Sequence, residues 1–316
     1  MSISPESSSK NNDAFLASVL NEFVIEKRRK RRWSIFFKLA LLIFIVIFFI
    51  VMCTGEDGNK ITADEPHTAL INLTGEIGAG NDVDADKVAT ALNNAFKNKG
   101  TKAIILRINS PGGSPVQSSY IYNEIMRLRA LHPTVPVYAV CVDVCASGAY
   151  YVASAAQDIY ADPSSLVGSI GVIMSGFGAD KAIEKLGISR RVYTAGSNKD
   201  MLDPFLPVSS QTKAYTQQML GIVHQQFIAA VEAGRGDRLK KSPDLFSGLV
   251  WTGVQAKNMG LVDGFGSTGY VARTIVKDDK IIDYTIKPTP FERFADRIGA
   301  SMGHIITSQF EGKISE

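Results

Sequence analysis

The chain has 316 residues, 45% of them hydrophobic and 9% aromatic, so it holds enough apolar material for a packed core. Its 27 glycines and 12 prolines exclude a collagen-like or low-complexity chain, and its three cysteines exclude a disulfide-rich scaffold. The formal net charge of +3 is a local feature, because residues 27–32 are six contiguous cations. The sequence therefore predicts no nucleic-acid partner.

A long apolar segment follows the basic block. Residues 33–53 carry a single charge, Lys38, and as a helix they would span about 31 Å, close to the roughly 30 Å of a bilayer core. The six preceding cations favour a membrane span over a buried helix of a soluble protein, and they place residues 1–32 in the cytoplasm as a basic arm. A cleaved signal peptide is disfavoured, because no small-x-small site follows at once. We expect everything after the span to lie outside the cytoplasm.

The rest of the chain divides into three parts. Residues 54–67 are polar and predict a tether. Residues 287–316 space apolar side chains at near-helical intervals, which favours an amphipathic tail that packs on the body or on a sister subunit over one that lies on a membrane surface. Residues 68–286 form the body.

Predicted strands and helices alternate along the body. Apolar runs without polar alternation are typical of a parallel sheet covered on both faces, so we predict a layered α/β domain. Strands are expected at 69–73, 103–108, 135–142, 159–161 and 170–174. Helices are expected at 84–97, from the turn at 111–113 to 131, at 147–156, around Lys181 and Lys185, at 209–233, and just before Gly260. A last helix and strand are expected to end near 286.

Two turns that follow apolar strands are candidates for chemistry. In the first, consecutive Gly112 and Gly113 would let successive backbone N–H groups point into open space and hold an oxyanion or a phosphate; the alternative is an ordinary tight turn. No GxxxxGK[ST] motif is present, so nothing favours a nucleotide. In the second, Ser147 stands between a strand and a helix, either as a nucleophile or as an ordinary N-cap. A GxSxG elbow would need glycine at 145 and 149, where this chain has Cys145 and Ala149.

A nucleophilic serine needs a base, and the sequence offers few. None of the four histidines follows a strand end, and no HExxH or clustered spacing indicates a metal or another cofactor. Lys199 follows a strand in a glycine-containing turn and is a possible base. Lysine in water has a pKa near 10.4, so any lysine base must be buried to act near neutral pH.

Four segments of the body resemble the signature segments of the signal peptide peptidase A family. They lie in the right order at 103–114, 145–151, 168–172 and 250–263. Members of this family are membrane-anchored serine proteases with a Ser/Lys dyad on a crotonase-like, Clp-protease-like α/β fold. The resemblance covers roughly 68–285. The chain departs from the family at Ala149, where a second glycine is common, and we expect the added methyl to narrow the pocket beside the nucleophile.

The resemblance implies a role for each candidate residue. It implies Ser147 as the nucleophile, Lys199 as the general base, Ser169 as a hydroxyl that orients Lys199, and the N–H groups of Gly112 and Gly113 as oxyanion donors. It further implies a homo-oligomeric ring in the bacterial cytoplasmic (inner) membrane that degrades apolar peptides such as signal-peptide remnants. The chain is the short form, so a single catalytic domain must supply both dyad residues.

Two other functions stay open at this level. An acyl-CoA hydratase or isomerase of the same fold would also use paired amides, although export separates it from cytoplasmic CoA. A membrane scaffold could keep the fold without chemistry. Cys141 and Cys145 would be able to bridge in an oxidising compartment, but a pair at the end of a buried strand is more often two inert core thiols.

Overall fold

The computed structural model describes residues 5–54, 65–240 and 242–287, and it divides the chain into two units. One unit contains helix α1 (Pro5–Thr54), whose apolar side chains between 33 and 50 are exposed. Among the described helices, Val24–Ile50 of α1 is the one stretch long and apolar enough to cross a membrane. This stretch overlaps the predicted span at 33–53 and also includes the predicted basic residues 27–32, and the bounds of the span stay a prediction. Most of the predicted tether and nearly all of the predicted tail fall outside the described residues.

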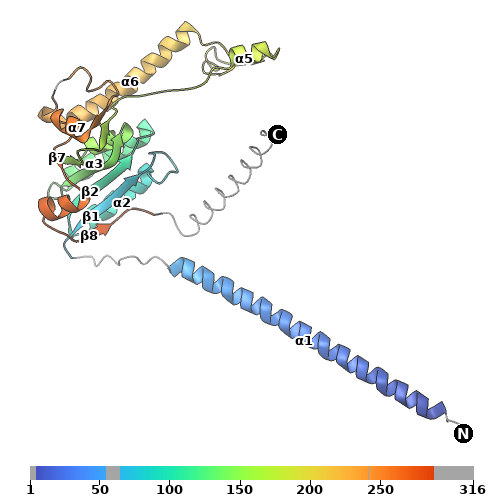
Figure 1. Ribbon diagram of the computed structural model, residues 1–316. Helices are drawn as coiled ribbons and strands as arrows, with labels where there is room; N and C mark the ends of the chain where they lie inside the picture. Colours follow the sequence, from blue (N-terminus) through green and yellow to red (C-terminus); the bar gives the residue numbers. More distant parts are fainter. Residues whose placement is uncertain (1–4, 55–64, 241, 288–316) are drawn as a thin grey trace. The chain divides into compact units, whose positions relative to one another are not determined.

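The other unit, Ile61–Lys287, is built on an eight-stranded sheet (Figure 1). The strand order is β6-β5-β3-β2-β1-β8, with β4 beside β3 and β7 beside β4, and every pair is parallel except β5–β6. This confirms the predicted layered α/β fold. The strands are β1 His67–Thr74, β2 Thr101–Ser110, β3 Val137–Ala146, β4 Asp158–Ala161, β5 Leu166–Gly168, β6 Val250–Thr252, β7 Gly264–Phe265 and β8 Ile281–Asp283.

Side chains that alternate along the central strands fill two cores. On β2, Ile104 and Leu106 belong to the larger core, whereas Ala103 and Ile105 face a smaller one on the other side of the sheet. The larger core is covered by α2 Ala85–Lys97, α3 Pro115–Leu131, α4 Gly148–Ser154 and α6 Ser210–Arg235, and the smaller by the π-helical turn η2 Val271–Val276. The remaining short helices are α5 Asp180–Lys185, η1 Gly236–Arg238, α7 Gly253–Asn258 and α8 Thr268–Tyr270.

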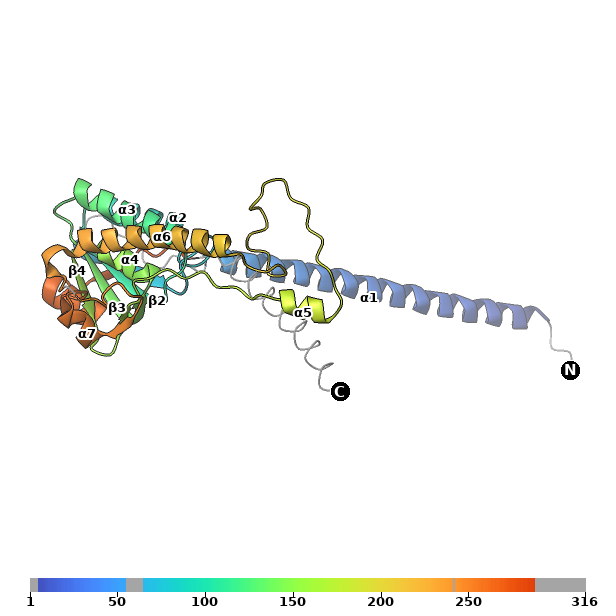
Figure 2. The ribbon, with the colours of Figure 1, turned by 90° about the horizontal axis from the view of Figure 1, so that it is seen from above.

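The predicted strand at 170–174 is wrong, and the structure has β5 just before it. Gly168 and Ser169 adopt positive φ values of 106° and 50°, which an extended strand does not allow, so the ladder ends at Gly168. From 171 to 209 the chain leaves the body as an arm that includes α5 and returns into α6 (Figures 1 and 2). No residue of α5 is buried.

Candidate active site

Ser147 stands between the end of β3 and the first residue of α4. Its backbone is held on both sides, since its N–H donates to Gly168 O (2.8 Å) and its carbonyl accepts from Tyr151 N–H (3.0 Å). Its φ of 54° is strained for a residue with a side chain, and its hydroxyl makes no capping hydrogen bond. The structure therefore contradicts the ordinary N-cap interpretation, and within the described ranges the Ser147 hydroxyl has no hydrogen-bond partner.

Two backbone N–H groups beside Ser147 lack partners. In the part of the chain that the structure describes, neither the Gly113 nor the Gly148 N–H makes a hydrogen bond. They are neighbours, because a Cβ placed on Gly148 would lie 3.4 Å from the Gly113 nitrogen. The Gly112 N–H, by contrast, donates to Ser110 Oγ (3.1 Å). The geometry thus favours Gly113, which was predicted, and Gly148, which was not, and it counts against Gly112 as a donor.

The absence of a side chain at Gly112 allows the backbone to pack closely against Ser147 and Gly148. A Cβ at this position would come within 2.7 Å of both Ser147 Cβ and the Gly148 nitrogen, and the φ of Gly112 is 101°. Only glycine avoids these contacts and also adopts this φ without strain. The Gly112–Gly113 turn can therefore lie directly against the first turn of α4.

A pocket of about 350 Å³ opens beside Ser147. Gly113 and Gly148 lie on its rim with the serine, and its walls are mostly apolar. Ala149 does not line it: its methyl is buried in the larger core, so the expected narrowing of the pocket is wrong. The wall residues include Val116, Tyr120, Tyr151, Ile173, Val223 and Phe227.

The other two predicted residues lie differently. Ser169 follows Gly168, the acceptor of the Ser147 N–H, and its own N–H donates to Leu249 O (2.8 Å). Lys199 lies on the arm, exposed, with no side-chain hydrogen bond or ion pair among the described residues, and it does not line the pocket. Within one chain, the structure therefore brings Ser147, Ser169 and the glycine turn together but not Lys199.

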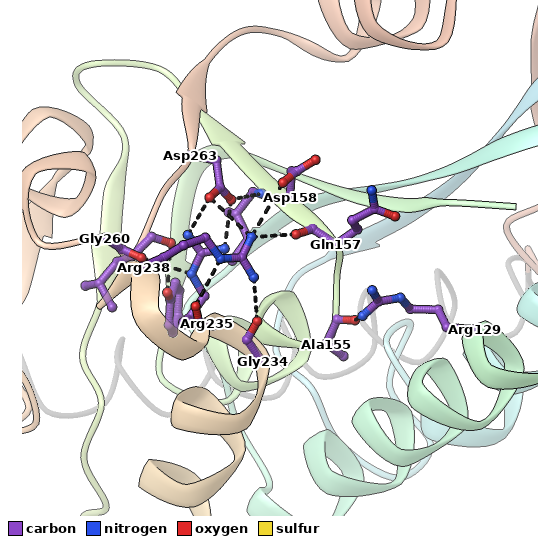
Figure 3. Close-up of polar contacts among 12 residues, drawn as sticks. Arg129, Ala155, Gln157, Asp158, Gly234, Arg235, Arg238, Gly260 and Asp263 are labelled. Carbon is purple, nitrogen blue, oxygen red and sulfur yellow. Dashed lines mark hydrogen bonds and ion pairs between the residues drawn. The ribbon is translucent and has the colours of Figure 1, made fainter. Parts of the chain in front are cut away.

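A buried ion-pair network fixes the elements around the site (Figure 3). The Arg235 guanidinium, at the end of α6, forks onto both carboxylate oxygens of Asp263 (2.7 and 2.8 Å) and also donates to Gly260 O (2.9 Å). Tyr150 of α4 donates to Leu261 O (2.8 Å) in the same loop. The loop 260–263 therefore holds together α4, the helix that follows Ser147, and α6, the helix that forms part of the pocket wall.

The pKa of Asp263 reflects this network. Burial would raise the pKa of Asp263, but the hydrogen bonds from Arg235 and from the Ile159 N–H (2.7 Å) outweigh burial and hold it below its ordinary value. The carboxylate is therefore ionised at neutral pH.

Among the described residues, the cysteines and the possible metal ligands do not form a second reactive or metal-binding site. Cys141 and Cys145 are unbridged and buried, and burial together with the neighbouring Cys141 thiol raises the pKa of Cys145. Such thiols react slowly, since the thiolate is the nucleophile. Among the described residues, no group of three histidine, cysteine, aspartate or glutamate side chains is arranged to hold a metal ion.

Comparison with known protein families gives two matches. A model of peptidase family S49 matches residues 129–281, which include Ser147, Ser169 and Lys199. A model of Clp protease matches residues 55–165, which include Ser147 and both glycines of the Gly112–Gly113 turn. The two matches overlap across the end of β3 and α4, where the nucleophile candidate lies.

Individual relatives bear different names. A Synechocystis protein named as a protease is 32% identical over 206 residues, covering 65% of this chain and 72% of that protein. An Enterococcus faecium protein named as a signal peptide peptidase, SppA, is 31% identical, covering 62% of this chain and 57% of its own length. The Na(+)/H(+) antiporter NhaA of Brucella melitensis is 42% identical over 213 residues, but this chain spans only 29% of it.

Proposed function

Because this chain belongs to peptidase family S49, we propose that it is a membrane-anchored serine endopeptidase that degrades apolar peptides, such as cleaved signal peptides, through a Ser/Lys dyad. The observation that carries the proposal is the setting of Ser147. A strained serine with a free hydroxyl faces two unpaired N–H groups at the mouth of an apolar pocket. This is the arrangement that acyl transfer requires.

The reaction would proceed in two steps. Ser147 Oγ attacks the peptide carbonyl while its proton passes to the neutral amine of Lys199, and the N–H groups of Gly113 and Gly148 hold the oxyanion. The C–N bond then breaks as the protonated lysine returns the proton to the leaving amine. The neutral lysine next takes a proton from water, which attacks the acyl ester; as the ester C–O bond breaks, the lysine returns this proton to Ser147 Oγ. Ser169, beside the backbone that anchors Ser147, would orient the lysine amine by accepting a hydrogen bond.

The dyad forms only if Lys199 comes to Ser147, and we propose that assembly into a ring achieves this. The arm exposes large apolar side chains, of which Phe177 and Tyr193 are 95% and 93% exposed. Exposed apolar surface of this extent is typical of an interface between protein molecules. In a ring, either the chain's own arm folds onto the body or the arm of a neighbouring subunit supplies the lysine.

The pocket and the anchor support the choice of substrate. An extended peptide laid past Ser147 would place one side chain into a pocket of about 350 Å³ walled by aliphatic and aromatic residues, which favours an apolar residue there. The span in α1, with its basic arm in the cytoplasm, would hold the body on the outer side of a bacterial inner membrane, where signal-peptide remnants are released.

The test is hydrolysis of apolar peptide amides by the full-length protein in detergent or nanodiscs. We expect Ser147→Ala and Lys199→Ala each to abolish turnover, and a serine-directed phosphonate to label Ser147 in the wild type. Lys181→Ala, which removes another exposed arm lysine, is the matched control and should keep full activity. Turnover by either dyad variant would refute the dyad.

Two further measurements resolve the remaining alternatives. Mixing inactive Ser147→Ala and Lys199→Ala chains should restore part of the activity if a neighbour supplies the lysine, and none if each chain completes its own dyad. CoA binding without phosphonate labelling would favour a hydratase or isomerase, and the absence of both would favour a scaffold.

A further inference from the structure

His224 of α6 is a polar side chain next to the site that the reaction above does not use. Its Nε2 lies 3.0 Å from Ile170 O. A carbonyl oxygen can only accept, so Nε2 carries the hydrogen and the imidazole is the donor. The ring is partly buried, and this is its one side-chain hydrogen bond among the described residues.

The acceptor lies at the last fixed point before the arm. Gly168 belongs to the sheet, and the Ser169 N–H is held by Leu249 O. Beyond them, in the described chain, the bond from His224 is the one hydrogen bond made by residues 170–178. The arm returns to the body through α6, which itself carries His224. The bond therefore ties the residue just before the arm to the middle of α6, the helix into which the arm returns.

The same bond links two elements that each supply part of the pocket wall. Residues 171–173 at the root of the arm form one part, and Val223, Gln226 and Phe227 of α6 form another. His224 lies in the same turn of α6 as these residues and holds Ile170, the residue just before the first part. Its hydrogen bond is thus placed to fix the separation of the two parts and the direction in which the arm starts.

We infer that His224 is a positioning residue: through Ile170 O it sets the width of the substrate pocket and the path of the arm that carries Lys199. The effect on selectivity rests on the proposed peptidase function, whereas the effect on the arm does not. A displacement of about 1 Å in a reacting group can cost on the order of 100-fold in rate, so loss of the bond should matter even though His224 contacts no reacting atom.

The test uses three variants of the full-length protein. His224→Gln places an amide N–H close to the position of Nε2, His224→Asn places it about where Nδ1 lies and too far from Ile170 O, and His224→Leu removes the donor while keeping apolar volume. We expect kcat/KM on apolar peptides to fall about 10- to 100-fold in the Leu and Asn variants and to stay near wild type in the Gln variant. In the Leu and Asn variants, the preference of the enzyme for phenylalanine over alanine in the substrate residue that enters the pocket should also weaken. The unfolding midpoints of the three variants should not rank in the same order as their kcat/KM values.

A second measurement does not depend on activity. Spin labels attached through Ser175→Cys on the arm and Leu131→Cys at the end of α3, both exposed, report the position of the arm root in a Cys53→Ser background, with labelled chains diluted in unlabelled ones. The distance distribution should broaden in the Leu and Asn variants and not in the Gln variant. An unchanged distribution in His224→Leu would overturn the inference, whatever the peptidase assay gives. A broadened distribution in a protein without peptidase activity would keep the inference and reject the proposed function.

Discussion

Replacing Asp263 with asparagine should be among the most destabilising single changes in the body. The two carboxylate oxygens accept four N–H donors: two from Arg235, one from Ile159 and one from Arg238 at 3.3 Å. In Asp263→Asn one oxygen becomes an amide NH₂, which faces donors it cannot bind. Arg235, only 1% exposed, would at the same time keep its charge without a counter-ion.

The size of the effect follows from burial. Breaking a buried ion pair by removing one partner costs about 3–5 kcal/mol, because the remaining charge stays desolvated. At about 2–4 °C for each kcal/mol in a domain of this size, the unfolding midpoint should fall by roughly 6–20 °C. Calorimetry of the full-length protein in detergent measures it directly.

Asp158→Asn is the matched control in the same network. Asp158 approaches Arg238 at 3.5 Å, and both side chains are partly exposed. Burial, followed by the charge of Asp263, raises the pKa of Asp158, so its negative charge is disfavoured where it lies. Neutralising it should change stability by less than about 1 kcal/mol. If Asp263→Asn also melted within about 2 °C of the wild type, the network would not support the fold as argued.

Three further results are expected. The pKa of Asp263 is lowered in the folded protein, so its contribution to stability is present above the unfolded pKa of about 3.9 and is lost as pH falls through the lower folded pKa. Acid should therefore destabilise the wild type more steeply than Asp263→Asn, which melting curves recorded at a series of pH values will measure. Gly112→Ala forces a Cβ to 2.7 Å from that of Ser147 at a φ of 101°, so we expect about 1–3 kcal/mol of strain and an activity loss on the order of 100-fold, measured by melting and peptide hydrolysis. In a Cys53→Ser background, Cys141 and Cys145 should not react with Ellman's reagent in the native protein and should both react in denaturant; rapid native labelling would contradict their burial.

The elements with strong periodicity could be predicted from the sequence alone. The apolar runs of β2 and β3 and the helical stripe of α2 came out within a few residues of their observed ends, because burial on both faces of a sheet or on one face of a helix leaves a direct pattern. β5 could not be predicted in this way, because a strand of only three residues is too short to show a periodic pattern of apolar side chains. The apolar run at 170–174 resembles a strand equally well, but within the described sheet it pairs with no other strand, because the ladder has already ended at Gly168.

The sequence indicated candidate side chains for the site but not the backbone groups around them. The place of Ser147 between a strand and a helix left it as either a nucleophile or an N-cap, and only the family resemblance favoured the nucleophile. The candidate donor at Gly148 is a backbone N–H, which every residue but proline carries, so the sequence gives no signal for it beyond the position after the serine. The Ser110 hydroxyl occupies the N–H of Gly112 only because the turn folds back on itself, a three-dimensional fact that consecutive glycines do not reveal.

The position of Lys199 could not be predicted for a different reason: the arm has few contacts of its own. Burying a large apolar side chain contributes about 1.5–3 kcal/mol, so covering Ile173, Phe177, Leu186 and Tyr193 would yield roughly 6–12 kcal/mol before the entropy of ordering the arm is subtracted, comparable to the stability of a whole domain. The surface that covers them would also exclude water around the lysine, which is the condition a lysine base needs. Assembly and catalysis would then be one event, and specific activity should fall on dilution together with the oligomer measured by light scattering. If specific activity stayed constant in a dilute monomer, catalysis would not depend on assembly.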